Sequence, residues 1–126
     1  RRQRQMCIRD SNALSTLKSL IDQLGMTALI ETHSEDEILF ACEIGAELIG
    51  INTRDLQTFQ TNRELFGELA SSIDTDAIKI AESSVRNVSD VEQYASYGAD
   101  CVLVGEALVT GDAADLVSSF SQVMKP

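Results

Sequence analysis

Two glutamates and one asparagine stand at the ends of short apolar runs in this 126-residue sequence, where their side chains could act together. Glu31, Asn52 and Glu82 follow the runs 28–30, 48–51 and 78–81, respectively, which are apolar except for Lys79. A carboxylate can accept and return protons, and a carboxamide can donate and accept hydrogen bonds. Because a buried carboxylate needs a partner, two of them at strand ends predict a shared polar cavity with displaced pKa values.

A fourth apolar run, residues 101–104, is followed by Gly105 and Glu106. If all four runs are parallel strands, their carboxyl ends lie along one edge of a sheet. That edge carries the active sites of α/β barrels. We therefore expect Glu31, Asn52, Glu82 and Gly105 to converge on one cavity.

Amphipathic helices are predicted between these strands. Apolar residues at helical spacing predict a first helix over residues 12–24. Two Ser-x-x-Glu sequences, Ser34 to Glu37 and Ser89 to Glu92, are typical of capping boxes and predict the starts of two further helices. The remaining helices are expected around residues 65–70 and after Asp112, which is a candidate helix cap.

Strands that alternate with helices predict right-handed crossovers and a parallel sheet. A complete (β/α)8 barrel needs roughly 250 residues. The present chain has 126. We therefore predict an α/β fold over residues 12–126, a partial (β/α)8 TIM barrel with four parallel strands and alternating helices.

Composition narrows the classes of partner. The formal net charge is −10, and residues 12–126 carry 6 basic against 19 acidic side chains. Such a surface repels a nucleic-acid backbone, so no nucleic-acid partner is expected. The sequence has no run of about 18 apolar residues, so no membrane partner is expected either. Three cysteines without a Cys-x-x-Cys spacing and a single histidine predict a cytoplasmic protein without a metal site or cofactor.

The first eleven residues, RRQRQMCIRDS, differ from the rest because they are basic and have neither a helical nor an alternating apolar period. A basic tail is one interpretation. The string from Met6 to Asp10 also resembles the translation of a transposon-end sequencing adaptor. We favour the second interpretation, in which residues 1–11 are a non-native or adaptor-derived tail outside the fold.

The strand-end segments resemble, in order, the fifth to eighth strand motifs of the indole-3-glycerol-phosphate synthase family. The stretch from Gly50 to Leu56, Gly-Ile-Asn-Thr-Arg-Asp-Leu, carries the most specific part of this resemblance. The other segments run from Ala28 to His33, from Ala81 to Ser83 and from Val102 to Glu106. The resemblance covers residues 12–126 and implies that they form the C-terminal half of the family's barrel.

That family closes an indole ring on 1-(o-carboxyphenylamino)-1-deoxyribulose 5-phosphate, with loss of carbon dioxide and water, in tryptophan biosynthesis. The resemblance implies that Glu31 handles protons and that Asn52 positions both the substrate and Glu31. It implies that Glu82 holds substrate hydroxyls or a catalytic ammonium group. A carboxy-lyase activity is therefore expected of the complete enzyme.

The resemblance also implies substrate contacts around these three residues. Arg54 and Ser83 are expected to bind the substrate, and Leu103 is expected to lie against its aromatic ring. Ser84, Gly105 and Glu106 are expected to bind the phosphate through backbone N–H groups, as loops seven and eight of barrels commonly do. The carboxylate of Glu106 is then expected to turn away from the phosphate.

The chain departs from the family pattern in two ways. Ser84 occupies a position where a glycine usually lets the backbone approach the phosphate closely. In addition, the family's general-acid lysine on strand three, and a second lysine and a glutamate on strand one, have no counterparts here. We therefore predict that the chain alone lacks synthase activity and that its partner is the missing N-terminal half-barrel.

Structural interpretations of the same residues remain open. Glu31 and Glu82 could be structural acids with satisfied hydrogen bonds, and Asn52 could be a turn former. Arg54 could serve only as an ion-pair residue. We interpret His33 as a loop residue beside a helix cap rather than as a base. Three aromatic residues are assigned to the core or to helix faces: Phe66, Tyr94 and Phe120.

Two other functions compete with the synthase. Other phosphate-binding barrels, such as phosphoribosylanthranilate isomerase, also use loops seven and eight, but they lack the Gly-Ile-Asn-x-Arg-Asp-Leu motif followed by Glu-Ser at these strand ends. A non-catalytic half-barrel could instead act as a folding or assembly module. The open edges of its sheet, at the first and last strands, would favour self-association.

Overall fold

The computed structural model describes residues 11–55 and 57–126, and it contains four strands alternating with helices. The strands are β1 (Leu29–Thr32), β2 (Leu48–Asn52), β3 (Ile78–Glu82) and β4 (Cys101–Leu103). The helices are α1 (Ser11–Gln23), α2 (Glu35–Glu43), α3 (Glu64–Ala70), α4 (Val88–Ser96), α5 (Glu106–Thr110) and α6 (Ala113–Phe120). The predicted tail falls almost wholly on residues 1–10, which lie outside the described residues.

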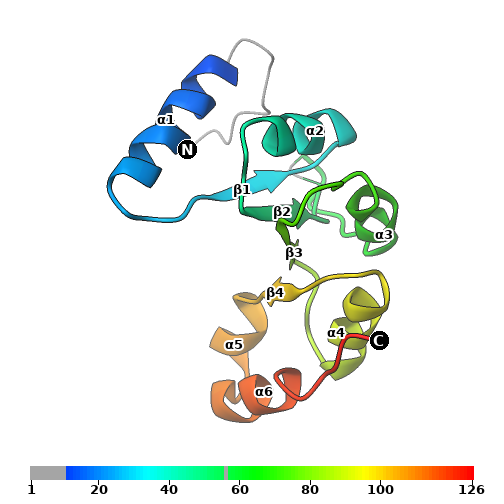
Figure 1. Cartoon of the computed structure of the whole chain (residues 1–126). Helices are drawn as coiled ribbons and strands as arrows, with labels where there is room; N and C mark the ends of the chain where they lie inside the picture. Colours follow the sequence, from blue (N-terminus) through cyan, green and yellow to red (C-terminus); the bar gives the residue numbers. More distant parts are fainter. Residues whose placement is uncertain (1–10, 56) are drawn as a thin grey trace.

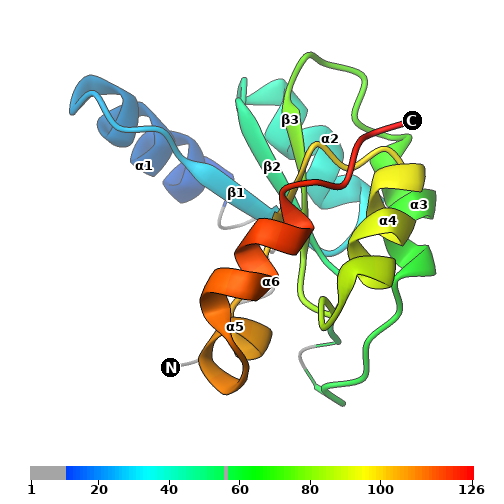
Figure 2. The same cartoon turned by 90° about the horizontal axis from the view of Figure 1, so that it is seen from below.

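All neighbouring strands pair in parallel, in the order β1-β2-β3-β4. The strands form an open arc with α2, α3 and α4 along its outer side (Figure 1). Viewed along a perpendicular direction, α1 extends away from the rest of the chain beyond β1 (Figure 2). The predicted fold class, a partial barrel of four parallel strands, is confirmed.

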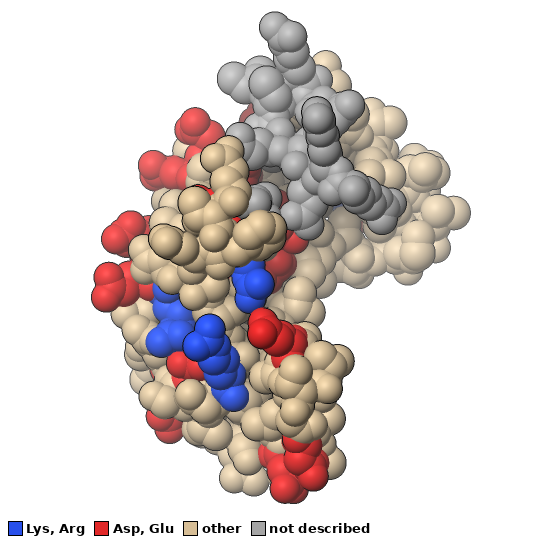
Figure 3. Space-filling view, turned by 180° about the vertical axis from the view of Figure 1, so that it is seen from behind, with Lys and Arg blue, Asp and Glu red and all other residues tan. Residues whose placement is uncertain are grey.

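Acidic side chains outline much of the face shown in Figure 3, in keeping with the net charge of −10. On the face shown there, the basic side chains lie close together near the middle of the molecule, with acidic side chains beside them. On this face, therefore, the basic groups are interrupted by acidic ones.

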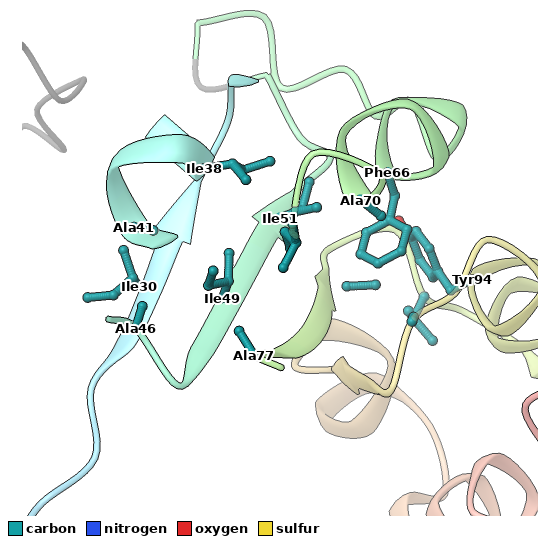
Figure 4. Close-up of a cluster of buried hydrophobic side chains, with 14 of the residues drawn as sticks. Ile30, Ile38, Ala41, Ala46, Ile49, Ile51, Phe66, Ala70, Ala77 and Tyr94 are labelled. Carbon is teal, nitrogen blue, oxygen red and sulfur yellow. The ribbon is translucent and has the colours of Figure 1, made fainter. Parts of the chain in front are cut away.

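The hydrophobic core lies between the outer face of the sheet and the helices (Figure 4). Ile30, Ile49 and Ile51 point from β1 and β2 towards Ile38 of α2, and all four are at most 6% exposed. Phe66 and Tyr94 continue the core between α3 and α4, with an edge-to-face ring contact of 5.4 Å between centroids. This packing fixes which face of each strand turns inward, because side chains alternate along a strand.

The inner face of the arc consequently carries the other set of side chains, including Glu31, Asn52, Glu82 and Leu103. Its apolar members are incompletely covered: Leu29 is 39% exposed and Leu103 is 51% exposed. In a closed barrel such residues fill the interior in layers. The inner face of this chain is therefore a core surface without its opposite wall in the described structure.

The helix starts are partly as predicted. Ser34 caps α2 by accepting a hydrogen bond from the Glu37 N–H, although the Glu37 carboxylate bonds the His33 N–H instead of returning to Ser34. Asp112 caps α6, as expected. The predicted box at Ser89 is wrong: α4 begins earlier, and Asn87 is its cap.

The displaced cap has a physical reason. Asn87 accepts a hydrogen bond from the Asp90 N–H, and the Asp90 carboxylate accepts one from the Arg86 N–H, the same arrangement as at the start of α2. Asparagine caps a helix as well as serine does. Starting at Val88 also lets Val91 reach the core. The short helix α5, between β4 and α6, was not predicted from the sequence at all.

Candidate active site

A hydrogen-bonded row of side chains runs along the carboxyl edge of the sheet. Asn52, the last residue of β2, donates from Nδ2 to Glu31 Oε1 of β1 at 3.1 Å. Its Oδ1 accepts from Ser83 Oγ at 2.9 Å and from the Arg54 backbone N–H at 3.0 Å. Because one carboxamide uses both ends of its amide group, it fixes the positions of Glu31 and Ser83 relative to each other.

Glu82 lies beside this row at the end of β3. It pairs with Asn52 across the sheet, and its residue is only 4% exposed. Burial, reinforced by the neighbouring Glu31 carboxylate, raises the pKa of Glu82 to about 7. The site thus holds two carboxyl groups, and the pKa of one of them is raised towards 7. Such a pair makes proton transfer near physiological pH possible.

Gly50 makes room for this pair. A Cβ atom at Gly50 would overlap the Glu82 carboxylate, which reaches across β2 in the direction of β1. Gly50 is also the direct register partner of Glu31. The glycine of the Gly-Ile-Asn sequence therefore permits the close approach of the two acids, and any larger residue would push them apart.

His33 has a larger place in the site than the sequence analysis gave it. Its Nε2 atom lies 3.2 Å from Glu31 Oε1, and its Nδ1 atom lies 3.5 Å from Glu37 Oε2. The loop position beside the α2 cap was recognised, but the imidazole also links Glu31 to the start of α2. A histidine two residues after a strand-end acid turns to the same edge, which is the signal that could have found it.

Most of the predicted substrate-binding residues line one cavity of about 830 Å³. It lies between the β3–α4 loop and the β4–α5 loop. Its lining includes Arg54, Glu82, Ser83, Ser84, Leu103, Gly105 and Glu106. Asn52 and His33 line a separate cavity of about 790 Å³, and Arg54 borders both. Of the four residues expected to converge on one cavity, only Glu82 and Gly105 line this one. Asn52 lines the separate cavity, and Glu31 lines neither of the two, although Asn52 bonds both Glu31 and Ser83.

Arg54 and Glu106, which both line the first cavity, form an ion pair with 3.3 Å between Nη2 and Oε2. The Glu106 side chain is 77% exposed, so the pair adds little to stability. The pair does hold the Glu106 carboxylate beside the Arg54 guanidinium group. This contact favours the ion-pair interpretation of Arg54 without removing the residue from the cavity lining.

Ser83 and Ser84 both have left-handed backbone conformations, with φ of 71° and 62°. Glycine adopts this region without strain, whereas other residues pay about 1–2 kcal/mol each. Ser84 thus keeps the turn that a glycine would favour at the same position. Ser84 is 8% exposed, and its hydroxyl lies within hydrogen-bond distance of Thr53 Oγ1, at 3.2 Å. The Ser84 side chain is therefore fixed by a contact within the protein.

The described residues contain neither a metal-ligand cluster nor a membrane-spanning helix. No group of three or more His, Cys, Asp or Glu side chains is arranged there to hold a metal ion. None of the described helices has both the length and the apolar character needed to cross a bilayer.

An arc of parallel strands, with acids and an amide at the carboxyl ends and a cavity under the last two loops, defines part of an α/β barrel, a fold whose active sites lie at that edge. The sequence profile of the family described as indole-3-glycerol phosphate synthase matches residues 6–120. The chain belongs to this family.

Curated relatives agree with this assignment. An indole-3-glycerol phosphate synthase of Leifsonia xyli is 47% identical over 114 residues, which are 90% of this chain and 44% of the relative. One of Rhodococcus opacus is 49% identical over 115 residues, 87% of this chain and 43% of the relative. The chain therefore spans less than half the length of these relatives.

Solved structures resemble the chain in fold alone. A mandelate oxidase variant gives a TM-score of 0.64 at 19% identity, covering 89% of this chain and 36% of that one. A FabK variant of Thermotoga maritima also gives 0.64, at 14% identity, covering 75% of this chain and 33% of that one. Both likenesses cover about a third of a larger protein, as a partial barrel should.

Proposed function

We propose that the chain forms the C-terminal half of the active site of an indole-3-glycerol-phosphate synthase, a carboxy-lyase that closes an indole ring on 1-(o-carboxyphenylamino)-1-deoxyribulose 5-phosphate. The observation that carries the proposal is the hydrogen-bonded row from Glu31 through Asn52 to Ser83, with Glu82 buried beside it. The reaction is proposed from membership of the family, and the side chains of this row are of the chemical types that the reaction needs.

Each group has a task that its surroundings support. Glu31 accepts and returns protons during ring closure and dehydration, because Asn52 holds it at the exposed end of β1. Glu82, protonated or ionised near neutrality, binds substrate hydroxyls or an ammonium group supplied by the rest of the barrel. Leu103 offers apolar surface to the aromatic ring.

The phosphate of the substrate binds in the cavity between the last two loops. Ser84, Gly105 and Glu106 contribute backbone N–H groups there, and Arg54 and Ser83 contact the neighbouring part of the substrate. The Glu106 carboxylate stays paired with Arg54 rather than facing the phosphate. These residue roles are proposals that rest on the cavity lining and on the family.

A chimeric barrel tests the proposed function. In this chimeric barrel, residues 12–126 replace the matching part of the Leifsonia xyli relative. We expect the purified chimera to convert the carboxyphenylamino substrate, as followed by indole fluorescence, and the 126-residue chain alone to show no turnover. A folded chimera without activity would contradict the function. Turnover by the chain alone would contradict the need for another half.

We also propose that an N-terminal half-barrel is the natural partner of the inner face, and that the chain self-associates without it. Within the described residues β1 and β4 each pair on one side only, and Leu29 and Leu103 are exposed beside them. Sedimentation should show concentration-dependent oligomers, and Leu29→Lys on the β1 edge should shift the chain to monomer. A monodisperse wild-type monomer with a cooperative melt would disprove self-association.

A further inference from the structure

Three consecutive backbone carbonyls at the end of β3 are each bound by a different side chain. The Glu82 carbonyl accepts from Thr53 Oγ1 at 3.1 Å, and the Ser83 carbonyl accepts from the Tyr94 hydroxyl at 3.2 Å. The Ser84 carbonyl accepts from Arg63 Nη1 at 3.4 Å. We call Thr53, Arg63 and Tyr94 the carbonyl anchors.

The carbonyl anchors come from different elements and also hold one another. Thr53 Oγ1 also lies 2.8 Å from the Tyr94 hydroxyl, so its single proton is shared between Tyr94 and the Glu82 carbonyl, which the Thr53 backbone N–H bonds as well at 3.2 Å. Arg63 is fixed by Gln93 Oε1 at 2.6 Å and by Asp90 at 3.2 Å, both on α4. The loop between β3 and α4 is therefore tied to the end of β2, to the start of α3 and to α4 at the same time.

The network is built to be rigid. Thr53 is 2% exposed and Tyr94 is fully buried, so a lost hydrogen bond here leaves a polar group without water. Burial raises the pKa of Tyr94, which keeps its hydroxyl protonated and able to donate. Such buried networks, when satisfied, specify one backbone arrangement.

The carbonyl anchors hold a strained stretch of backbone, the turn at Ser83 and Ser84. Ser83 and Ser84 have φ of 71° and 62°, and their carbonyls are the ones bound by Tyr94 and Arg63. Among the described residues, none accepts a hydrogen bond from the backbone N–H of Ser83 or Ser84. Successive N–H donors in a tight turn form a concavity suited to an anion. Both residues line the 830 Å³ cavity.

We propose that the carbonyl anchors are positioning residues for phosphate binding: by holding the carbonyls of residues 82–84, they fix the left-handed turn at Ser83 and Ser84 and leave its N–H groups for the substrate phosphate. The inference rests on the proposed function and deepens it. It assigns Tyr94 a role at the site through its hydroxyl, beyond the packing of its ring. It also explains how a serine can stand at residue 84.

The test measures binding of inorganic phosphate to the chimeric barrel by isothermal titration calorimetry, so that it does not depend on turnover. Tyr94→Phe should weaken phosphate binding by about 3- to 10-fold, the effect of one buried hydrogen bond. Ser84→Gly removes the strain at residue 84, which adjoins the peptide group whose carbonyl the Tyr94 hydroxyl holds. In the Ser84→Gly background, therefore, Tyr94→Phe should change affinity by less than about twofold.

Tyr97→Phe is the matched control for loss of a tyrosine hydroxyl, because Tyr97 lies one helical turn further along and accepts from Gln93 Nε2, so it reaches the carbonyl anchors only indirectly, through the bond between Gln93 and Arg63. It should leave phosphate affinity unchanged. Equal losses for Tyr94→Phe with and without Ser84→Gly would overturn the inference, since the hydroxyl would then affect phosphate binding independently of the strained turn at residue 84. Absence of phosphate binding to the parent chimera would also overturn it. Failure of turnover with intact phosphate binding would instead contradict only the proposed synthase reaction.

Discussion

Glu31→Gln in the chimeric barrel is expected to lower kcat by about 10²- to 10⁴-fold while changing KM little. Glutamine keeps the size of the side chain and an oxygen that can accept the Asn52 hydrogen bond, so the row from Glu31 to Ser83 stays in place. What is lost is the ability to take up a proton. The measurement is steady-state turnover, with circular dichroism to confirm the fold.

Glu37→Gln is the control for the loss of negative charge near this site. Glu37 lies 3.5 Å from His33, which in turn lies 3.2 Å from Glu31, so it belongs to the same electrostatic neighbourhood. Its amide form can still accept the hydrogen bond from the His33 N–H. We expect less than about a threefold change in kcat. A similarly small change for Glu31→Gln would refute its role in proton transfer.

The strand ends were predictable from the sequence because one rule governs them. Parallel strands linked by helices present their carboxyl ends at one edge, so Glu31, Asn52 and Glu82 had to meet there. The observed strands extend to include these residues, since their backbones still pair across the sheet. The hydrogen bond between Asn52 and Glu31 depends on the register of β1 against β2, and no pattern in the sequence predicts that register.

Helix starts were less predictable because two local patterns competed. Ser89 with Glu92 and Asn87 with Asp90 both have the spacing of a cap and its partner. The second pair is used because Asp90, once buried, can also bind Arg63. That contact joins residues 27 positions apart in the sequence. Such tertiary contacts decide between local alternatives of equal strength.

The carbonyl anchors escaped sequence analysis for a related reason. Tyr94 was assigned to the core, and its ring does pack there against Phe66. The same side chain ends in a hydroxyl that a core phenylalanine would lack, and a buried hydroxyl must find a partner. Which partner it finds depends on the course of the β3–α4 loop. Only coordinates show that Tyr94 reaches the Ser83 carbonyl.

Glu82→Gln is expected to flatten the dependence of stability on pH in the 126-residue chain. The folded-state pKa of Glu82 is raised to about 7 from an ordinary 4.5, by burial first and by Glu31 second. The folded state therefore binds more protons than the unfolded state between these two values. The contribution of Glu82 to the free energy of unfolding should therefore be greatest below pH 4.5 and should fall as pH rises towards 7. The loss should be on the order of 1–2 kcal/mol, because partial contact with solvent weakens the effect of burial.

Urea unfolding at pH 5 and pH 8, at a protein concentration where sedimentation shows one species, measures this difference. Glu82→Gln should gain stability relative to wild type on going from pH 5 to pH 8, because its amide has no proton to lose. Glu92→Gln, an exposed position on α4, corrects for the change in net charge. Glu31→Gln should reduce the wild-type slope without removing it, because burial is the larger cause of the raised pKa of Glu82. Parallel curves for wild type and Glu82→Gln would mean that the two acids do not share a desolvated site.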